Sequence, residues 1–172
     1  MAIFLQWDDN SISGDVTDQG TSQSGKPFKG CIQLNSMQWG LGRAIGSQST
    51  SSEADRESCL PTVSEMVVTK DQDSSSGNLM RAACAAPTMK VAKLVHIYIV
   101  NAGANGSLDY ISYDLENTLI SGWSQSSGGD RPSESLTLNF TKITFNYANQ
   151  GPATSQQGPD SPSYDLAQQL GA

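Results

Sequence analysis

The residue types that most often carry chemistry are sparse in this chain. Its 172 residues include one histidine, His96, and three cysteines, Cys31, Cys59 and Cys84. His96 lies inside an apolar run, residues 91–100, so we expect a core or interface histidine with satisfied hydrogen bonds and not a catalytic base. The cysteines lack the spacing of zinc ligands and are typical of structural thiols in a reducing compartment.

Paired carboxylates are the remaining candidates for a hydrolytic active site. Asp71 and Asp73 precede a helical pattern, and Asp114 and Glu116 share one face of an expected strand, so a carboxylate hydrolase stays an alternative. Helix capping and solvation explain both pairs more simply. The glycines of residues 40–46 do not open a helix within a βαβ unit, which a dinucleotide site requires. The sequence therefore predicts no enzyme, no metal and no cofactor.

Composition narrows the class of protein further. The formal charge is −7 and the sequence pI is about 4.4, which excludes nucleic acid as an expected partner because phosphate contacts need clustered cations. No segment has the run of apolar residues that a stable membrane insertion requires. Residues 1–9 hold only a short apolar stretch followed at once by two aspartates, which does not fit a signal peptide, so we expect a chain made in the cytoplasm without one.

The elements expected from hydrophobic periodicity are mostly strands. One short helix is expected at residues 76–85, where apolar residues share a helical face. We expect strands at residues 3–7, 32–39, 63–69, 91–100, 108–115, 118–123, 136–140 and 143–147. These make one domain over residues 1–147. The polar tail, 148–172, is expected to be flexible or to dock only on assembly.

Two long polar segments interrupt these strands. Residues 10–29 are rich in Gly, Ser and Asp, and residues 40–61 have no periodicity over a length that few loops in a compact domain reach. A loop of the second kind usually serves an interface or is disordered.

The apolar alternation changes parity within two expected strands. Ile32 and Leu34 are followed by Met37, and the even-numbered set ending at Phe140 is followed by Ile143. Side chains alternate with period two, so the change indicates either ordinary bulges or strands that bury one side in their own subunit and the other against a neighbour. Both interpretations stay open from the sequence.

The order of several motifs resembles one known family. The matching segments are GCIQLNSMQWG (30–40), VTKDQD (68–73), LMRAAC (79–84), TLISG (118–122), GG (128–129), ESLTLNF (134–140) and FNY (145–147). Their order and spacing, over roughly residues 3–147, resemble the haemolysin-coregulated proteins (Hcp), which form the inner tube of bacterial type VI secretion systems. The long segment 10–29 and the Gln- and Pro-rich tail depart from the usual pattern.

The resemblance implies a fold, an assembly and a set of contacts. The fold would be mainly β, a closed or partly open β-barrel of two packed sheets with one short α-helix at its side. The subunit would assemble into stacked hexameric rings, work with the type VI sheath, spike and effector proteins, and be secreted to the outside or into target cells. Candidate lumen or cargo contacts are Ser36 and Gln38. Candidate subunit or ring contacts are Trp39, Gly40, Leu41, Arg43, Ile45, Ile143 and Phe145.

Two other interpretations fit parts of the sequence. A monomeric carbohydrate- or protein-binding β-sandwich would use Trp7, Trp39 and Trp123 as exposed stacking surfaces. Viral tail-tube proteins share the barrel and ring, so the sequence does not separate a bacterial from a phage origin.

Overall fold

The structure is a computed structural model that describes residues 1–8, 10–43, 60–84, 92–103, 106–147, 161–168 and 170–171. Its elements, in chain order, are β1 (Ala2–Trp7), β2 (Ile32–Leu34), β3 (Ser36–Gln38), β4 (Leu41–Arg43), β5 (Pro61–Val63), β6 (Met66–Asp71), α2 (Ser76–Cys84), β7 (Ala92–Gly103), β8 (Gly106–Ser126), β9 (Ser133–Asn139), β10 (Lys142–Tyr147), β11 (Ser163–Asp165) and β12 (Leu170–Gly171). The prediction of a mainly β fold with a short helix is confirmed.

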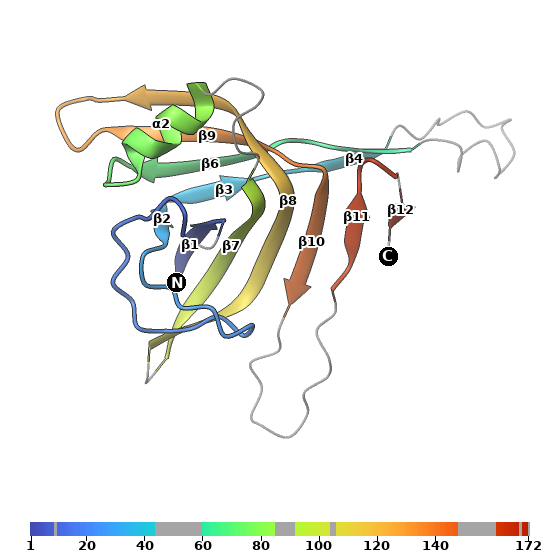
Figure 1. The fold of residues 1–172 in the computed structure, drawn as a ribbon, viewed down its shortest axis with the longest axis horizontal. Coiled ribbons are helices and arrows are strands. Elements are labelled where there is room, and N and C mark those ends of the chain that lie inside the picture. Colours follow the sequence, from blue (N-terminus) through green and yellow to red (C-terminus); the bar gives the residue numbers. More distant parts are fainter. Residues whose placement is uncertain are drawn as a thin grey trace, which may run out of the picture.

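The fold is organised around β8, a strand of 21 residues that belongs to both sheets. Its first half pairs antiparallel with β7 on one side and β10 on the other, and its second half pairs with β9. One sheet runs β12-β11-β10-β8-β7-β1-β2, and β9, β6 and β3 continue from β8 as the second wall (Figure 1). The hydrogen-bonded path does not close on itself, so the barrel is partly open.

Both parity changes are bends at which the chain moves from one sheet to the other. β2 pairs with β1 and β3 pairs with β6, with the bend at Asn35. At the first bend, Leu34 belongs to the main core cluster and Met37 packs against that cluster. At the second bend, Phe140 and Ile143 both belong to the same cluster. The residues next to each bend therefore face one core, and the bends account for the change of parity there. Phe145 and Tyr147, later in the second set, lie outside this core cluster, and a contact between them and a neighbouring subunit stays a prediction.

Three other predicted segments differ in extent. The two strands expected at residues 108–115 and 118–123 are one continuous strand, β8. The ends of the expected loop 40–61 form a two-stranded arm, β4 with β5, that projects from the body (Figure 1). In the tail, β11 already pairs with β10 within the single chain. The boundary of the domain at residue 147 stays a prediction.

A buried cation holds the helix against the barrel. Lys70, on the core side of β6, is fully buried, and its Nζ lies 3.1 Å from Glu134 Oε2 and 2.8 Å from Asp73 Oδ1. It also donates to the Ser76 hydroxyl, 3.2 Å away, at the first residue of α2. A buried charge is tolerated only when it is paired in this way. The network fixes where α2 starts relative to β6 and β9.

We expect Lys70→Met to lower the free energy of unfolding by about 3–5 kcal/mol, because it leaves the buried Glu134 carboxylate without its cation. The double variant Lys70→Met/Glu134→Leu removes both charges and should recover most of the loss. Urea unfolding measures both. Equal destabilisation of the single and double variants would contradict this account of the network.

Candidate assembly interface

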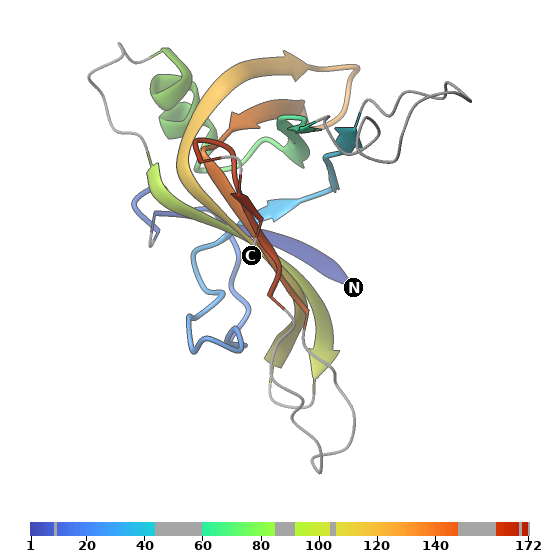
Figure 2. The same cartoon turned by 90° about the vertical axis from the view of Figure 1, so that its right-hand side faces the viewer.

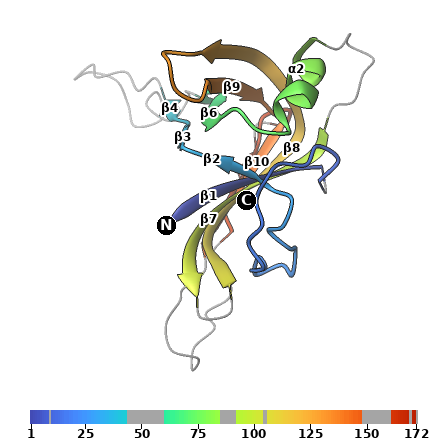
Figure 3. The same cartoon turned by 90° about the vertical axis from the view of Figure 1, so that its left-hand side faces the viewer.

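Residues 10–31 cover one face of the sheet formed by β1, β7 and β8, and Figure 3 shows them running beside β1 and β7. The Phe28 side chain is fully buried there, with its ring 5.5 Å from that of Phe4 and 5.3 Å from that of Tyr98. Cys31 is buried in the same cluster, where burial raises its thiol pKa to about 12. The even-numbered face of this sheet is thus occupied by the chain itself.

Two carboxylates anchor this segment to β8. Asp18 accepts bonds from the backbone N–H and hydroxyl of Ser107, and the hydroxyl bond is the main reason that its pKa is lowered. Asp109 accepts a bond from the backbone N–H of Gln23, at 2.7 Å, but burial dominates and raises its pKa. Between them, Gly20 approaches the Ser107 backbone so closely that a Cβ would lie 2.0 Å from the Ser107 carbonyl oxygen.

His96 has a structural role, as predicted. Its ring is buried, with Nδ1 2.5 Å from Asp114 Oδ1 and Nε2 3.0 Å from Lys26 Nζ. Because an ammonium only donates, Nε2 is the acceptor and the proton sits on Nδ1, facing the carboxylate. The ring therefore links residues 10–31 to β8, and both of its nitrogens are occupied.

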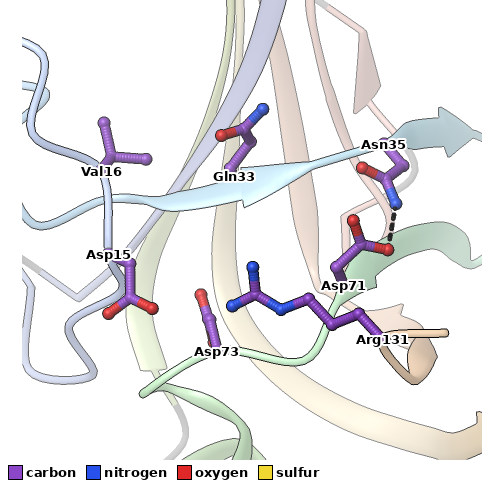
Figure 4. A pocket seen from close by; sticks show the side chains of 7 residues that line it. All are labelled: Asp15, Val16, Gln33, Asn35, Asp71, Asp73 and Arg131. Carbon is purple, nitrogen blue, oxygen red and sulfur yellow. Dashed lines mark hydrogen bonds between the residues drawn. The ribbon is translucent and has the colours of Figure 1, made fainter.

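The candidate hydrolytic carboxylates are also engaged. Glu116 pairs with Lys142 at 3.0 Å, and Asp114 is bonded to His96. Asp71 and Asp73 line a pocket of about 170 Å³, together with Asp15, Val16, Gln33, Asn35 and Arg131 (Figure 4). Within it, Asn35 donates to Asp71, Asp73 binds Lys70, and a bond from the Ser74 hydroxyl lowers the pKa of Asp15. A general acid needs the opposite shift.

Other candidate chemistry finds no support among the described residues. There, no three His, Cys, Asp or Glu side chains gather as metal ligands would, and no helix is long and apolar enough to cross a membrane. None of the three tryptophans is exposed, since Trp7 is buried and Trp39 and Trp123 are partly buried. Cys84 is exposed at the end of α2, and Cys59 lies outside the described residues.

The sheet formed by β1, β7, β8 and β10 is called the projecting sheet below. Its odd-numbered face is apolar and only partly covered. Ile3, Ile99, Ile111 and Tyr147 lie directly opposite one another across β1, β7, β8 and β10, so their side chains point to one face. The three isoleucines are partly exposed and Tyr147 is 46% exposed. We call these four residues the apolar row. Ile3 also packs against the main core cluster, whereas Ile99, Ile111 and Tyr147 are not among the residues packed against it. These three lie on β7, β8 and β10, which extend from the body (Figure 1, Figure 2).

An aromatic cluster connects this row to the arm. The Tyr113 ring lies 5.9 Å from that of Trp39, just before β4, and 5.3 Å from that of Phe145. Trp39 and Phe145, far apart in the sequence, therefore contact the same ring, and Trp39 and Tyr113 also pack against the main core cluster. Tyr113 lies in the strand expected at residues 108–115, and nothing in the sequence indicated its contact with either ring.

The other predicted contact residues are more scattered. Leu41 is 62% exposed on β4, Arg43 is exposed at the end of that strand, and Gly40 binds Ser64 at the base of the arm. Ile45 lies outside the described residues. Ile143 differs from the prediction, because it is 4% exposed and packs in the core, leaving almost no side chain for a neighbour.

On the solvent face of the second wall, two rows of directly paired residues carry only uncharged side chains. Ser36 and Gln38 are both exposed on this face, and the Ser36 hydroxyl lies 2.6 Å from that of Thr69. The rows are Ser36, Thr69, Ser135, Ser124 and Gln38, Val67, Thr137, Gly122, taken across β3, β6, β9 and β8. Sequence reasoning found only the β3 members, since the others are assembled by strand register.

Comparison with known proteins identifies the family. The sequence matches the family described as type VI secretion system effector, Hcp, over residues 4–147. The chain belongs to the Hcp family.

Relatives and solved structures agree with this assignment. The curated protein Hcp1 of Pseudomonas aeruginosa is 34% identical over 90 residues, a match that covers 51% of this chain and 54% of that protein, or about half of its length. A structure of a type six secretion system protein has a TM-score of 0.80 at 19% identity, covering 99% of both chains. Hcp1 from Salmonella typhimurium gives 0.70 at 21% identity, covering 99% of this chain and 98% of its own. These structures share the Hcp fold.

We expect opposite effects from neutralising the two anchoring carboxylates. The lowered pKa of Asp18 means that its ionised form stabilises the folded state above about pH 4, so Asp18→Asn should lower the Tm at neutral pH. The raised pKa of Asp109 means that ionisation costs stability, and Asp109→Asn keeps an acceptor for Gln23, so its Tm should be unchanged or higher.

Thermal scans across pH measure both effects. The two differences from the parent should shrink as the pH falls below about 3, where both carboxylates are protonated in the unfolded chain. Equal losses of Tm for the two variants at neutral pH would contradict the assignment.

Proposed function

We propose that this Hcp protein is a structural subunit of the type VI inner tube. Copies would close head to tail into a hexameric ring, rings would stack into the tube, and contraction of the surrounding sheath would drive them out of the cell. The observation that carries this proposal is the apolar row on a sheet that projects beyond the barrel of an Hcp-family chain.

The row supplies a driving force for association. Full burial of an isoleucine side chain is worth about 1.5–3 kcal/mol, so covering three partly exposed isoleucines and Tyr147 contributes substantially to one interface. A closed ring needs two different surfaces on each subunit. The row with Phe145 would be one, and the arm, with Trp39, Gly40, Leu41, Arg43 and Ile45, would supply contacts to a neighbouring subunit or ring.

The uncharged second wall fits the lumen of such a ring. Serine, threonine and glutamine side chains offer hydrogen bonds without long-range attraction or repulsion, which suits brief contacts with effector proteins of different charge. Ser36 and Gln38 are the proposed cargo contacts. No catalytic role is proposed, since the candidate acids and His96 already have structural partners.

The alternative is a monomeric binding β-sandwich with exposed tryptophans. The burial of Trp7 and the partial burial of Trp39 and Trp123 disfavour it.

Light scattering and negative-stain images of the purified protein test the ring. We expect a hexamer with annular particles, and Ile111→Lys should convert it to monomers because a charge enters the apolar row. Thr17→Lys, at an exposed position of the segment that covers the opposite face, is the control and should leave the mass unchanged. A monomeric parent protein, or an Ile111→Lys variant that still forms rings, would refute the proposed interface.

A photo-crosslinking amino acid at position 38 tests the lumen. In secreting cells we expect it to capture co-expressed effector proteins, whereas the same amino acid at position 17 should not. Equal capture at both positions, or capture only at position 17, would contradict the proposed cargo contact and indicate that effector proteins bind another surface.

A further inference from the structure

The outer edge of β10 is covered by the end of the chain. β11 pairs with it antiparallel, with Ile143 opposite Tyr164 and Thr144 opposite Ser163. Tyr164 and Leu166 pack against the main core cluster. The edge of β10 therefore works as a docking site for a strand with two apolar side chains.

This docked segment makes few backbone contacts with the rest of the sheet. Only three residue pairs join β11 to β10, with flanking bonds from the Phe145 N–H to the Pro162 carbonyl and from the Leu166 N–H to the Thr141 carbonyl. Asp165 accepts bonds from the N–H groups of Ala167 and Gln168, which shapes the turn toward β12. An element with so few contacts opens at low free energy compared with the core.

The link to this unit is longer than its position requires. An antiparallel neighbour needs a loop of about 2–5 residues, but residues 148–162 supply fifteen. They are Ala, Asn, Asp, Gln, Gly, Pro, Ser and Thr, none with a large apolar side chain. The sequence of the link therefore offers little apolar surface for burial, and its length exceeds that of a hairpin connection.

That length is sufficient to reach another subunit. Fifteen extended residues span up to about 50 Å, whereas a domain of this size is about 40 Å across. The link also begins at Tyr147, within the apolar row that forms the proposed interface. Exchange between copies replaces each contact with an identical one, so it differs from pairing within the chain mainly by the entropy of the link.

We infer that in the assembled ring the segment Ser163–Asp165, with Leu166, pairs with β10 of a neighbouring copy, so that each subunit completes the sheet of the next. This exchange rests on the proposed ring. It adds a strand-to-strand tie between subunits to the side-chain contacts of the apolar row.

Thr144 and Ser163 give a direct test. The flanking backbone bonds make 143/164 and 145/162 the hydrogen-bonded pairs, so 144/163 is a non-hydrogen-bonded pair with its Cα atoms close enough for a disulfide. Both side chains point away from the core and are partly exposed. In a background with Cys59→Ser and Cys84→Ser, chains with Thr144→Cys are coexpressed with chains that carry Ser163→Cys and the sample is oxidised.

Exchange predicts a covalent dimer of the two chains on non-reducing gels, because neither chain holds both cysteines. A chain with both substitutions should give a ladder of covalent oligomers. Rings that yield no mixed dimer, and only an internally closed monomer from the double variant, would overturn the inference while leaving the proposed function intact. Absence of rings by light scattering would instead refute the proposed function and the exchange with it.

A shortened link gives an independent measurement. Deleting residues 149–158 restricts the strand to its own β10, so we expect the rings to dissociate at lower urea concentration than those of the full chain. Rings of unchanged urea resistance would also overturn the exchange.

Discussion

The pairing of β7 with β8 is the constraint on which the rest of the structure depends. β8 runs through both sheets, so one strand holds β7 and β10 at one end and β9 at the other. Because side chains alternate along such a strand, each half presents a core face and an outer face, and the neighbouring strands must match both. The bends at Asn35 and Thr141 follow from this requirement, since each moves the chain between sheets while keeping its apolar residues on the core side.

The two faces of the projecting sheet differ in how far other parts of the chain cover them. Residues 10–31 cover the even-numbered face with an aromatic cluster and with bonds to Asp109 and His96. On the odd-numbered face, the part of the chain that the structure describes places no such cluster over Ile99, Ile111 and Tyr147 of the apolar row. Covering one face within the chain prevents that face from associating, and so confines apolar association to the other.

The sequence was informative where local pattern decides the structure. Alternation predicted most strands, the helical spacing before Cys84 predicted α2, and the isolated position of His96 predicted a structural histidine. The motif order predicted the Hcp family. Pairing between distant strands could not be predicted from the sequence. The apolar row needs the register of four strands, the uncharged wall needs the pairing of β3, β6, β9 and β8, and the Lys70 network needs Glu134 brought from a distant strand. Asn117 lies where two strands were expected to separate, and only the pairings on both sides of β8 show that the strand continues through it.

Barrels avoid unwanted association by leaving no free strand edges, but this fold keeps an edge at β10 and covers it with a short strand. An edge covered by three residue pairs is protected in the isolated chain, and exchange between copies would replace the contacts of Tyr164 and Leu166 with the core by identical ones. The apolar row reaches the same edge at Tyr147 of β10, whereas the uncharged rows lie on the opposite wall. Association and transport surfaces would thus be separated by β8 itself. A substitution that weakens subunit contact on the projecting sheet need not alter the wall proposed to face cargo, because no side chain belongs to both.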